Sequence, residues 1–217
     1  MDPDKLKEIL REHKLWLETK GESCYAPFKG KQADLSGADL SRVNLSGVDL
    51  SRADLRNSDL HGADLSYSDL SNANLCGADL SEASLGKANL YQTNLSGANL
   101  YKANLREAGL YKANFYKADL SNTDLRGVVL IEAILREANI NGANLSGADL
   151  SGADLCKAKL VNTNLSKANL RDADLREANL IGADIHEADF RGAYLSWVII
   201  SKSQKDQIIK VLLFKVK

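Results

Sequence analysis

Large apolar residues occupy every fifth position of this chain from Leu35 to Leu195. Thirty-three such positions follow one another without interruption, and all are Leu except Phe115, Ile140, Ile185 and Phe190. An α-helix turns about 100° per residue, so a spacing of five would spread these side chains around its whole circumference. The spacing therefore excludes a helix here. It predicts a solenoid, in which each unit buries its apolar side chain against copies of itself.

The residues around each apolar position also repeat. A small residue, usually Ala as at Ala33 and Ala38, stands two positions earlier, and the residue between is mostly Asp or Asn, which gives the unit A-D/N-L-x-x. Four such units close a square coil of twenty residues, so residue n is expected to stack on residue n+20. The apolar and small residues then point inward and the other three outward. Coils about 4.8 Å apart would give a rod of roughly 40 Å.

This unit resembles that of the bacterial pentapeptide-repeat family, and the resemblance covers residues 31–200 without an insertion. It implies an all-β fold, a right-handed quadrilateral parallel β-helix of about eight coils. The run A-D-L-S-G-A-D-L, at residues 33–40 and 148–155, is most similar to the cyanobacterial branch of the family.

Residues 1–30 precede the repeats and are expected to form an N-terminal amphipathic helix and a lead-in. Asp2 is a favourable N-cap and Pro3 a favourable first helical residue, and apolar residues recur at helical spacing until Gly21. The phrase H-x-x-W-L-x-x-x-G, from His13 to Gly21, is similar to a segment that precedes the repeats in bacterial relatives.

Residues 201–217 are expected to form a second amphipathic helix. Ser203 and Asp206 have the spacing of a capping box. The apolar residues that follow are Ile208, Ile209, Leu212, Leu213 and Val216. Because the ends of a solenoid expose apolar side chains and strand edges, both terminal helices are predicted to be caps. In some family members the C-terminal segment joins two rods, so the resemblance allows either a monomer or a tip-to-tip homodimer.

Composition restricts the location and the redox chemistry. The chain has 217 residues, of which 44% are hydrophobic, and a net charge of −1. No apolar run reaches the roughly 20 residues of a membrane span, and no secretory signal pattern is present, so we expect a soluble cytoplasmic protein that does not bind membranes. Cys76 and Cys156 fall in one outward column four coils apart, too far for a disulfide, and should be free thiols.

The sequence offers no catalytic constellation. Its three histidines, His13, His61 and His186, belong to no metal-binding or nucleophile motif, and no phosphate-binding loop occurs. Pairs of carboxylates are frequent only because the repeat places Asp before Leu. We therefore predict a protein that is not an enzyme and holds neither a cofactor nor a metal.

Asp39, Asp59 and Asp79 are predicted to form an uninterrupted acidic stripe. They could accept hydrogen bonds from backbone N–H groups at the corners, as in Asx turns. Alternatively they could mimic DNA, because some members of the family resemble B-DNA and bind DNA gyrase, inhibiting it or protecting it from quinolones. About 40 Å of B-DNA carries about 24 charges. Residues 31–200 have 22 acidic and 17 basic side chains, a net charge of only −5, which favours the hydrogen-bonding role.

Apolar side chains also occur at outward positions in the middle of the repeats. Tyr91, Tyr111 and Ile131 share one column, and Val129 and Ile134 replace the usual Asp or Asn. The candidate partner-binding residues are Tyr91, Tyr101, Tyr111, Tyr116, Val129, Ile131 and Ile134. They could bind a partner, or only stabilise neighbouring coils. We predict a regulatory or scaffolding protein that presents a rigid surface to an unidentified protein. Nucleic acid is not expected as a partner at this net charge.

Overall fold

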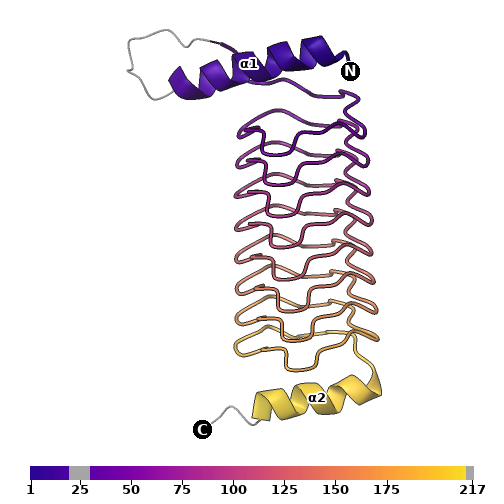
Figure 1. The fold of residues 1–217 in the computed structure, drawn as a ribbon. Coiled ribbons are helices and arrows are strands. Elements are labelled where there is room, and N and C mark those ends of the chain that lie inside the picture. Colours follow the sequence, from indigo (N-terminus) through magenta and orange to yellow (C-terminus); the bar gives the residue numbers. More distant parts are fainter. Residues whose placement is uncertain (20–29, 214–217) are drawn as a thin grey trace.

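The computed structural model describes residues 1–19 and 30–213, except for the side chains of residues 207 and 210–213. It contains two helices, α1 (Pro3–Thr19) and α2 (Lys202–Leu213). Between them the chain winds into stacked coils, and the helices lie across opposite ends of the stack (Figure 1). Each coil contributes single parallel β-bridges rather than long strands, from Asp34↔Asp54 to Asn179↔Ile199. Every bridge joins residue n to residue n+20, which confirms the twenty-residue coil.

Backbone hydrogen bonds connect each coil to the next. The N–H of Asp54 donates to the carbonyl of Ala33 at 2.9 Å, and the N–H of Leu35 donates to the carbonyl of Asp54 at 2.7 Å. The same pair of bonds recurs on all four sides of the coil. Each outward Asp or Asn therefore sits at the centre of a short parallel ladder.

The corners are tight turns that follow each Leu. The N–H of Ala38 donates to the carbonyl of Leu35 at 3.1 Å, and this bond across three residues recurs along the chain. The second residue after Leu has a positive φ, for example +57° at Lys102. A β-turn with a left-handed residue at its third position is of type II. The path thus changes direction every five residues.

The interior is filled by the fifth-position residues and the small residues two positions before them. Leu105 is fully buried and Ala103 is 1% exposed. Where Thr replaces Ala the hydroxyl is satisfied by a carbonyl, as in the 2.7 Å bond from Thr93 Oγ1 to Leu70 O. These contacts confirm the inward assignment of both positions.

Each terminal helix contacts the end of the stack with apolar side chains. The Asp4 N–H donates to Asp2 Oδ1 at 3.0 Å, so Asp2 is the N-cap of α1. Leu6 of α1 and Ile208 of α2 belong to the same buried cluster as the leucine stack.

The capping of α2 differs from the expected pair Ser203 and Asp206. Ser201 N–H donates to Gln204 Oε1 at 2.8 Å, and Gln204 N–H donates to Ser201 Oγ at 3.3 Å. The prediction was wrong by two residues because Gln204 also fits the motif and donates its amide to two carbonyls of the last coils, Leu180 O and Ala183 O. Among the apolar residues named for this helix, Ile208 is buried and Ile209 is 40% exposed. The side chains of Leu212 and Leu213, and all of Val216, lie outside the described residues.

At some corners the neighbouring coil leaves little space for a side chain in place of glycine. Two corners with similar φ allow a test of this restriction. A Cβ added at Gly142 (φ +69°) would lie 2.6 Å from Asn122 Oδ1 in the preceding coil, whereas one added at Gly147 (φ +66°) meets nothing within 4 Å. We expect Gly147→Ala to cost roughly 1 kcal/mol, the usual penalty of a left-handed alanine. Gly142→Ala should cost more in urea denaturation, and adding Asn122→Gly should remove the excess. Equal costs for the two alanines would contradict this coupling.

Candidate functional site

The outward residues at the centres of the ladders define four sides of the coil. The first side carries Asp34 to Tyr194, the second Asp39 to Ile199, the third Asn44 to Asp184 and the fourth Asp49 to Asp189, each at intervals of twenty residues. The two residues after each Leu form the corner that follows its side. Each surface residue can therefore be placed by its number alone.

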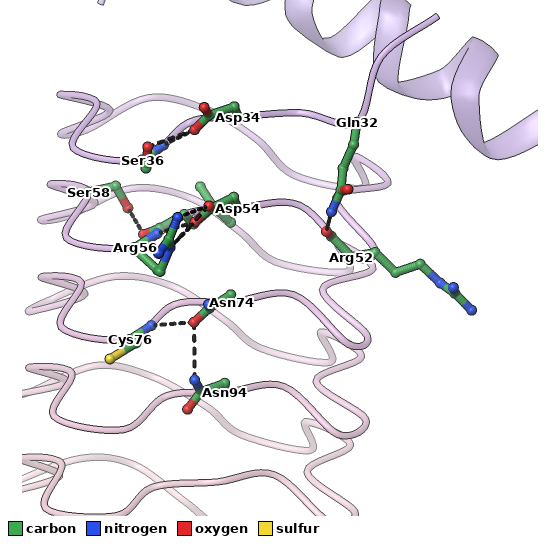
Figure 2. Close-up of polar contacts among 11 residues, drawn as sticks. Gln32, Asp34, Ser36, Arg52, Asp54, Arg56, Ser58, Asn74, Cys76 and Asn94 are labelled. Atoms are coloured by element: carbon green, nitrogen blue, oxygen red, sulfur yellow. Dashed lines mark hydrogen bonds and ion pairs between the residues drawn. The ribbon is translucent and has the colours of Figure 1, made fainter. Parts of the chain in front are cut away.

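At most ladder positions the carboxyl or amide oxygen of the outward Asp or Asn accepts a hydrogen bond from the backbone N–H two residues later, in the corner. Asp34 Oδ1 accepts from the Ser36 N–H at 3.1 Å, and Asn74 Oδ1 accepts from the Cys76 N–H at 3.2 Å. Figure 2 shows this arrangement along the first side, together with the 3.1 Å bond that Asn94 Nδ2 donates to Asn74 Oδ1. The Asx bond stabilises the corner, and the amide bond connects successive coils.

The acidic stripe makes the Asx bonds that the sequence predicts. The Oδ1 atoms of Asp39, Asp59 and Asp79 accept from backbone N–H groups two residues later at 3.0, 3.0 and 2.9 Å. A hydrogen bond from the Ser41 hydroxyl lowers the pKa of the Asp39 carboxyl. Asn99 donates to Asp79 at 3.0 Å, but among the described residues no such donor separates the three carboxylates from one another. The stripe is thus held at its corners but not along its length.

Arginines neutralise other carboxylates of the first and third sides. Arg56 Nη2 lies 2.6 Å from Asp54 Oδ2, and this hydrogen-bonded pair lowers the pKa of the Asp54 carboxyl. Asp124 and Asp174 have lowered pKa values for the same reason, through Arg126 and Arg176. Part of the acidic charge counted from the sequence is therefore compensated locally.

Six of the seven predicted partner-binding residues lie together on the fourth and first sides and their corners. Tyr91, Tyr111 and Ile131 form the corner column between these sides, and the rings of Tyr91 and Tyr111 stack with centroids 5.7 Å apart. Val129 on the fourth side and Ile134 on the first are each 41% exposed. Tyr116 lies on the other corner of the first side. We call this set the tyrosine patch: Tyr91, Tyr111, Tyr116, Val129, Ile131 and Ile134.

Tyr101 does not join the tyrosine patch. It lies ten residues, or half a coil, from both Tyr91 and Tyr111, which places it on the diagonally opposite corner. The Lys102 Nζ lies 5.0 Å from its ring centroid, the same distance at which Lys112 and Lys117 lie over the rings of Tyr111 and Tyr116.

The surface of the patch is poor in net charge. The outward ladder positions on its two sides between residues 74 and 134 hold no carboxylate, only Asn74, Asn89, Asn94, Gly109, Asn114, Val129 and Ile134. The corner charges are paired, since Lys112 lies 3.3 Å from Glu132 and Lys117 lies 3.6 Å from Glu137. An apolar strip is therefore bordered by neutralised pairs.

The patch also lacks several Asx bonds of the repeat. Gly109, Val129 and Ile134 have no side-chain acceptor, and within the described residues the N–H groups two positions later, at Tyr111, Ile131 and Arg136, have no hydrogen-bond partner. One hydrogen bond of the ladder is also longer here. The Val129 N–H donates to Ala108 O at 3.4 Å, whereas the Ile134 N–H donates to Ala113 O at 2.9 Å. These substitutions weaken the repeat where they create the patch.

Sequence reasoning missed a second exposed apolar set at the C-terminal end of the stack. Tyr194, Trp197 and Ile199 are 61%, 85% and 50% exposed. The fifth-position residues there, Leu195 and Ile200, are only half-buried. The replacement of Asp or Asn by Tyr194 and Ile199 was the available signal, because it is the same departure that marks Val129 and Ile134.

We also searched the described residues for metal sites, disulfides and membrane-spanning helices. Within the described residues, 1–19 and 30–213, no group of His, Cys, Asp and Glu side chains is arranged to hold a metal ion. Cys76 and Cys156 are free thiols, as predicted. Neither helix, over its described residues, is long and apolar enough to cross a membrane.

Comparisons with known proteins agree with the repeat. The family described as pentapeptide repeats matches the chain in eight copies over residues 31–62, 58–97, 88–127, 123–160, 133–172 and 158–196. None of the curated proteins matches this sequence.

Several solved structures are similar. HetL, a pentapeptide-repeat protein involved in heterocyst differentiation regulation from the cyanobacterium Nostoc sp. strain PCC 7120, is 36% identical, with 79% of this chain and 90% of HetL covered and a TM-score of 0.30. Rfr23 from the cyanobacterium Cyanothece 51142 is 24% identical over 78% of this chain and 89% of its own, with a TM-score of 0.25. QnrB1, a plasmid-mediated fluoroquinolone resistance protein, is 19% identical over 84% and 97%, with a TM-score of 0.41. The repeat, rather than a close superposition, relates these proteins.

The acidic stripe can be tested by replacing its central carboxylate. Asp59→Asn keeps the Oδ1 acceptor for the corner, removes repulsion from two neighbouring carboxylates and adds a donor toward Asp39. We expect it to stabilise the protein by up to about 1 kcal/mol in low salt, and by less in high salt. Asp119→Asn is the matched control, because Asp119 stands between Asn99 and Asn139 in the same column. Urea denaturation should show a smaller effect there. A destabilised Asp59→Asn would mean that the carboxylates themselves hold the coil.

Proposed function

Because the chain belongs to the pentapeptide-repeat family, whose fold is a right-handed β-helix, we propose that it acts without catalysis by presenting a rigid surface to another protein. The proposed role is regulatory or scaffolding, and the surface is the tyrosine patch. Neither a cofactor nor a nucleic acid is part of the proposal, and a cytoplasmic location is assumed.

One observation carries the proposal: the patch gives up stabilising bonds. At three neighbouring positions the repeat's usual Asp or Asn is replaced by Gly109, Val129 or Ile134, and the corner N–H that follows each loses its acceptor. A side chain that served only to hold coils together would be expected to keep these bonds, which contribute about 1 kcal/mol each when well formed. Exposed aromatic and aliphatic side chains instead favour a binding surface.

The shape and charge of the patch indicate the kind of partner. Its side chains spread over two adjoining sides and the corner between them, so the contact surface is an edge of the rod rather than a pocket. Its charged neighbours are already paired within the chain. We therefore propose a partner that contributes an apolar groove or a concave face, with few charges at its centre.

The alternative function is DNA mimicry directed at gyrase. Similarity to QnrB1 supports the shared fold but, at 19% identity, nothing more. A mimic needs regularly distributed negative charge, and the first and fourth sides lack it over the middle coils. Inhibition or protection of gyrase supercoiling by the purified protein would favour this alternative over the tyrosine patch.

The same proposal assigns residues 31–200 to the binding rod and residues 1–30 and 201–217 to its ends, as capping segments. Support comes from the apolar contacts of Leu6 and Ile208 with the leucine stack.

The patch can be tested by restoring the repeat. The double variant Val129→Asn with Ile134→Asn returns both positions to the family pattern without stacking a carboxylate on Asp149. It should leave stability unchanged or raise it by up to about 1 kcal/mol through the regained Asx bonds. Cross-linking in a lysate of the host should recover a specific protein with the unmodified chain and lose it with the variant. Tyr111→Ala with Ile131→Ser should have the same effect on recovery.

Lys159→Asn is the matched control, because Lys159 also replaces Asp or Asn but lies on the second side, away from the patch. This control should still recover the protein. Undiminished recovery with both patch variants would rule out the tyrosine patch as the binding surface.

A homodimer through the C-terminal end is a second candidate assembly. The inward Leu35 and Leu40 of the first coil are at most 1% exposed, whereas the inward Leu195 and Ile200 of the last coil are only half-buried. The outward residues of the last coil include the exposed Tyr194, Trp197 and Ile199. Aromatic residues with this exposure are typical of interface centres. We propose that a second copy of the chain covers this end, in a tip-to-tip arrangement.

Light scattering after size exclusion tests the assembly. We expect a dimer for the unmodified chain, and a monomer of unchanged stability for Tyr194→Gln with Trp197→Gln, because both side chains are largely exposed. The matched control is Tyr67→Gln, since Tyr67 is 64% exposed on a distant coil. A monomer for the unmodified chain across the micromolar range would dismiss the dimer.

A further inference from the structure

His13 is a buried titratable residue that the proposed function does not use. Its side chain lies between α1 and the first coil, is 0% exposed and stacks on Trp16 with ring centroids 5.7 Å apart. Nδ1 accepts a hydrogen bond from the Ala33 N–H at 3.0 Å. A nitrogen that accepts carries no proton, so the neutral ring has its proton on Nε2. Nε2 is itself buried and makes no hydrogen bond of normal geometry in the described part of the chain, although the Ser51 backbone lies close enough to favour the protonated ring.

The bond to Ala33 replaces one that the repeat makes elsewhere. At later corners the N–H of the small residue donates to the carbonyl of the Leu three positions earlier, as Ala38 does to Leu35. Ala33 begins the first unit, and no Leu stands three positions before it, where the residue is Gly30. The lone pair of His13 supplies the missing acceptor. The first corner of the solenoid is therefore completed by a side chain of α1.

Protonation would act against this contact in two ways. It would convert Nδ1 from an acceptor into a donor that faces the Ala33 N–H, and it would place a charge where water does not reach. Among the titratable groups of α1 and the first coil, Asp49 is the one whose charge acts on the ring, and it favours the protonated form, as does the Ser51 backbone. Burial outweighs both and lowers the pKa of His13.

We propose that α1 is a proton-sensitive cap, docked on the first coil while His13 is neutral and released from it when His13 takes up a proton. The direction follows from linkage. The undocked imidazole is exposed and binds a proton below its ordinary pKa of about 6.5, whereas the docked one does not. Docking is therefore at full strength above that pH and weakens as the pH falls through the range below it.

Release would change the surface of the protein. Leu35, Leu40, Leu45 and Leu50 of the first coil are at most 1% exposed. Without α1 they would form an open apolar end with unpaired ladder groups, a surface prone to self-association. The other histidines are not placed to act in this way: His186 is exposed, and the Nδ1 of His61 lies 3.0 Å from the Ser81 hydroxyl at the surface.

Hydrogen exchange measured by mass spectrometry tests the proposal on the full chain. Protection of peptides from residues 31–50, corrected for intrinsic exchange rates, should fall by up to about tenfold between about pH 7.5 and about pH 5.5. Peptides from residues 111–130 should not change and serve as the internal reference. His186→Gln should behave as the unmodified chain. His13→Asn, whose Oδ1 can replace Nδ1 as an acceptor but does not titrate, should keep its protection at both pH values.

Two results would overturn the proposal: an equal loss of protection in His13→Asn, or no pH dependence in the unmodified chain. If His13→Asn fails to dock at any pH, NMR titration of the imidazoles in the unmodified chain decides. The His13 resonance should titrate below the ordinary imidazole pKa of about 6.5, in step with the loss of first-coil protection. A His13 resonance that titrates at the ordinary imidazole pKa would refute a buried, docking-linked proton site.

Discussion

The hydrogen-bonded ladder between coils is the constraint on which the rest of this structure depends. Its spacing of about 4.8 Å brings every side chain against its equivalent twenty residues away. Inside, that distance stacks Leu on Leu and leaves room only for Ala, Ser, Thr or Val beside it. Outside, it brings like residues into contact, so that carboxylates repel, amides form hydrogen bonds and tyrosines stack. The sequence of each surface column thus decides whether neighbouring coils attract or repel.

Most of the architecture could be predicted from the sequence because one period controls it. The inward set from Leu35 onward, the n to n+20 stacking and the Asx bonds of the acidic stripe all follow from a single repeating unit. The cap of α2 could not be placed in the same way, since two overlapping polar pairs satisfied the motif. Only contact with the last coil, where the Gln204 amide meets the Leu180 and Ala183 carbonyls, selects one of them.

The candidate surfaces were less accessible to sequence reasoning, and for a geometric reason. Residue numbers gave the columns correctly, but the angular position of a column decides which residues are neighbours. Tyr101 shares its coils with the tyrosine patch and yet lies on the opposite corner. Trp197 occupies a corner position where charged residues are usual, so periodicity alone gave it no weight. Only the structure shows that the Trp197 side chain, in the last coil of the stack, is 85% exposed.

Among the described residues, the amide bonds between Asn and Asp or Asn at neighbouring ladder positions all run toward the preceding coil. Asn89, Asn99 and Asn139 each donate Nδ2 to an Asp in the preceding coil. Where Asn precedes Asp instead, as in Asn104 and Asp124, the described residues include no such bond. The order of coils along the rod is therefore not interchangeable, even though every coil has the same backbone. Duplicated or shuffled coils would keep these amide bonds only where an amide follows an acid, so the apparently uniform repeat has a direction along the rod.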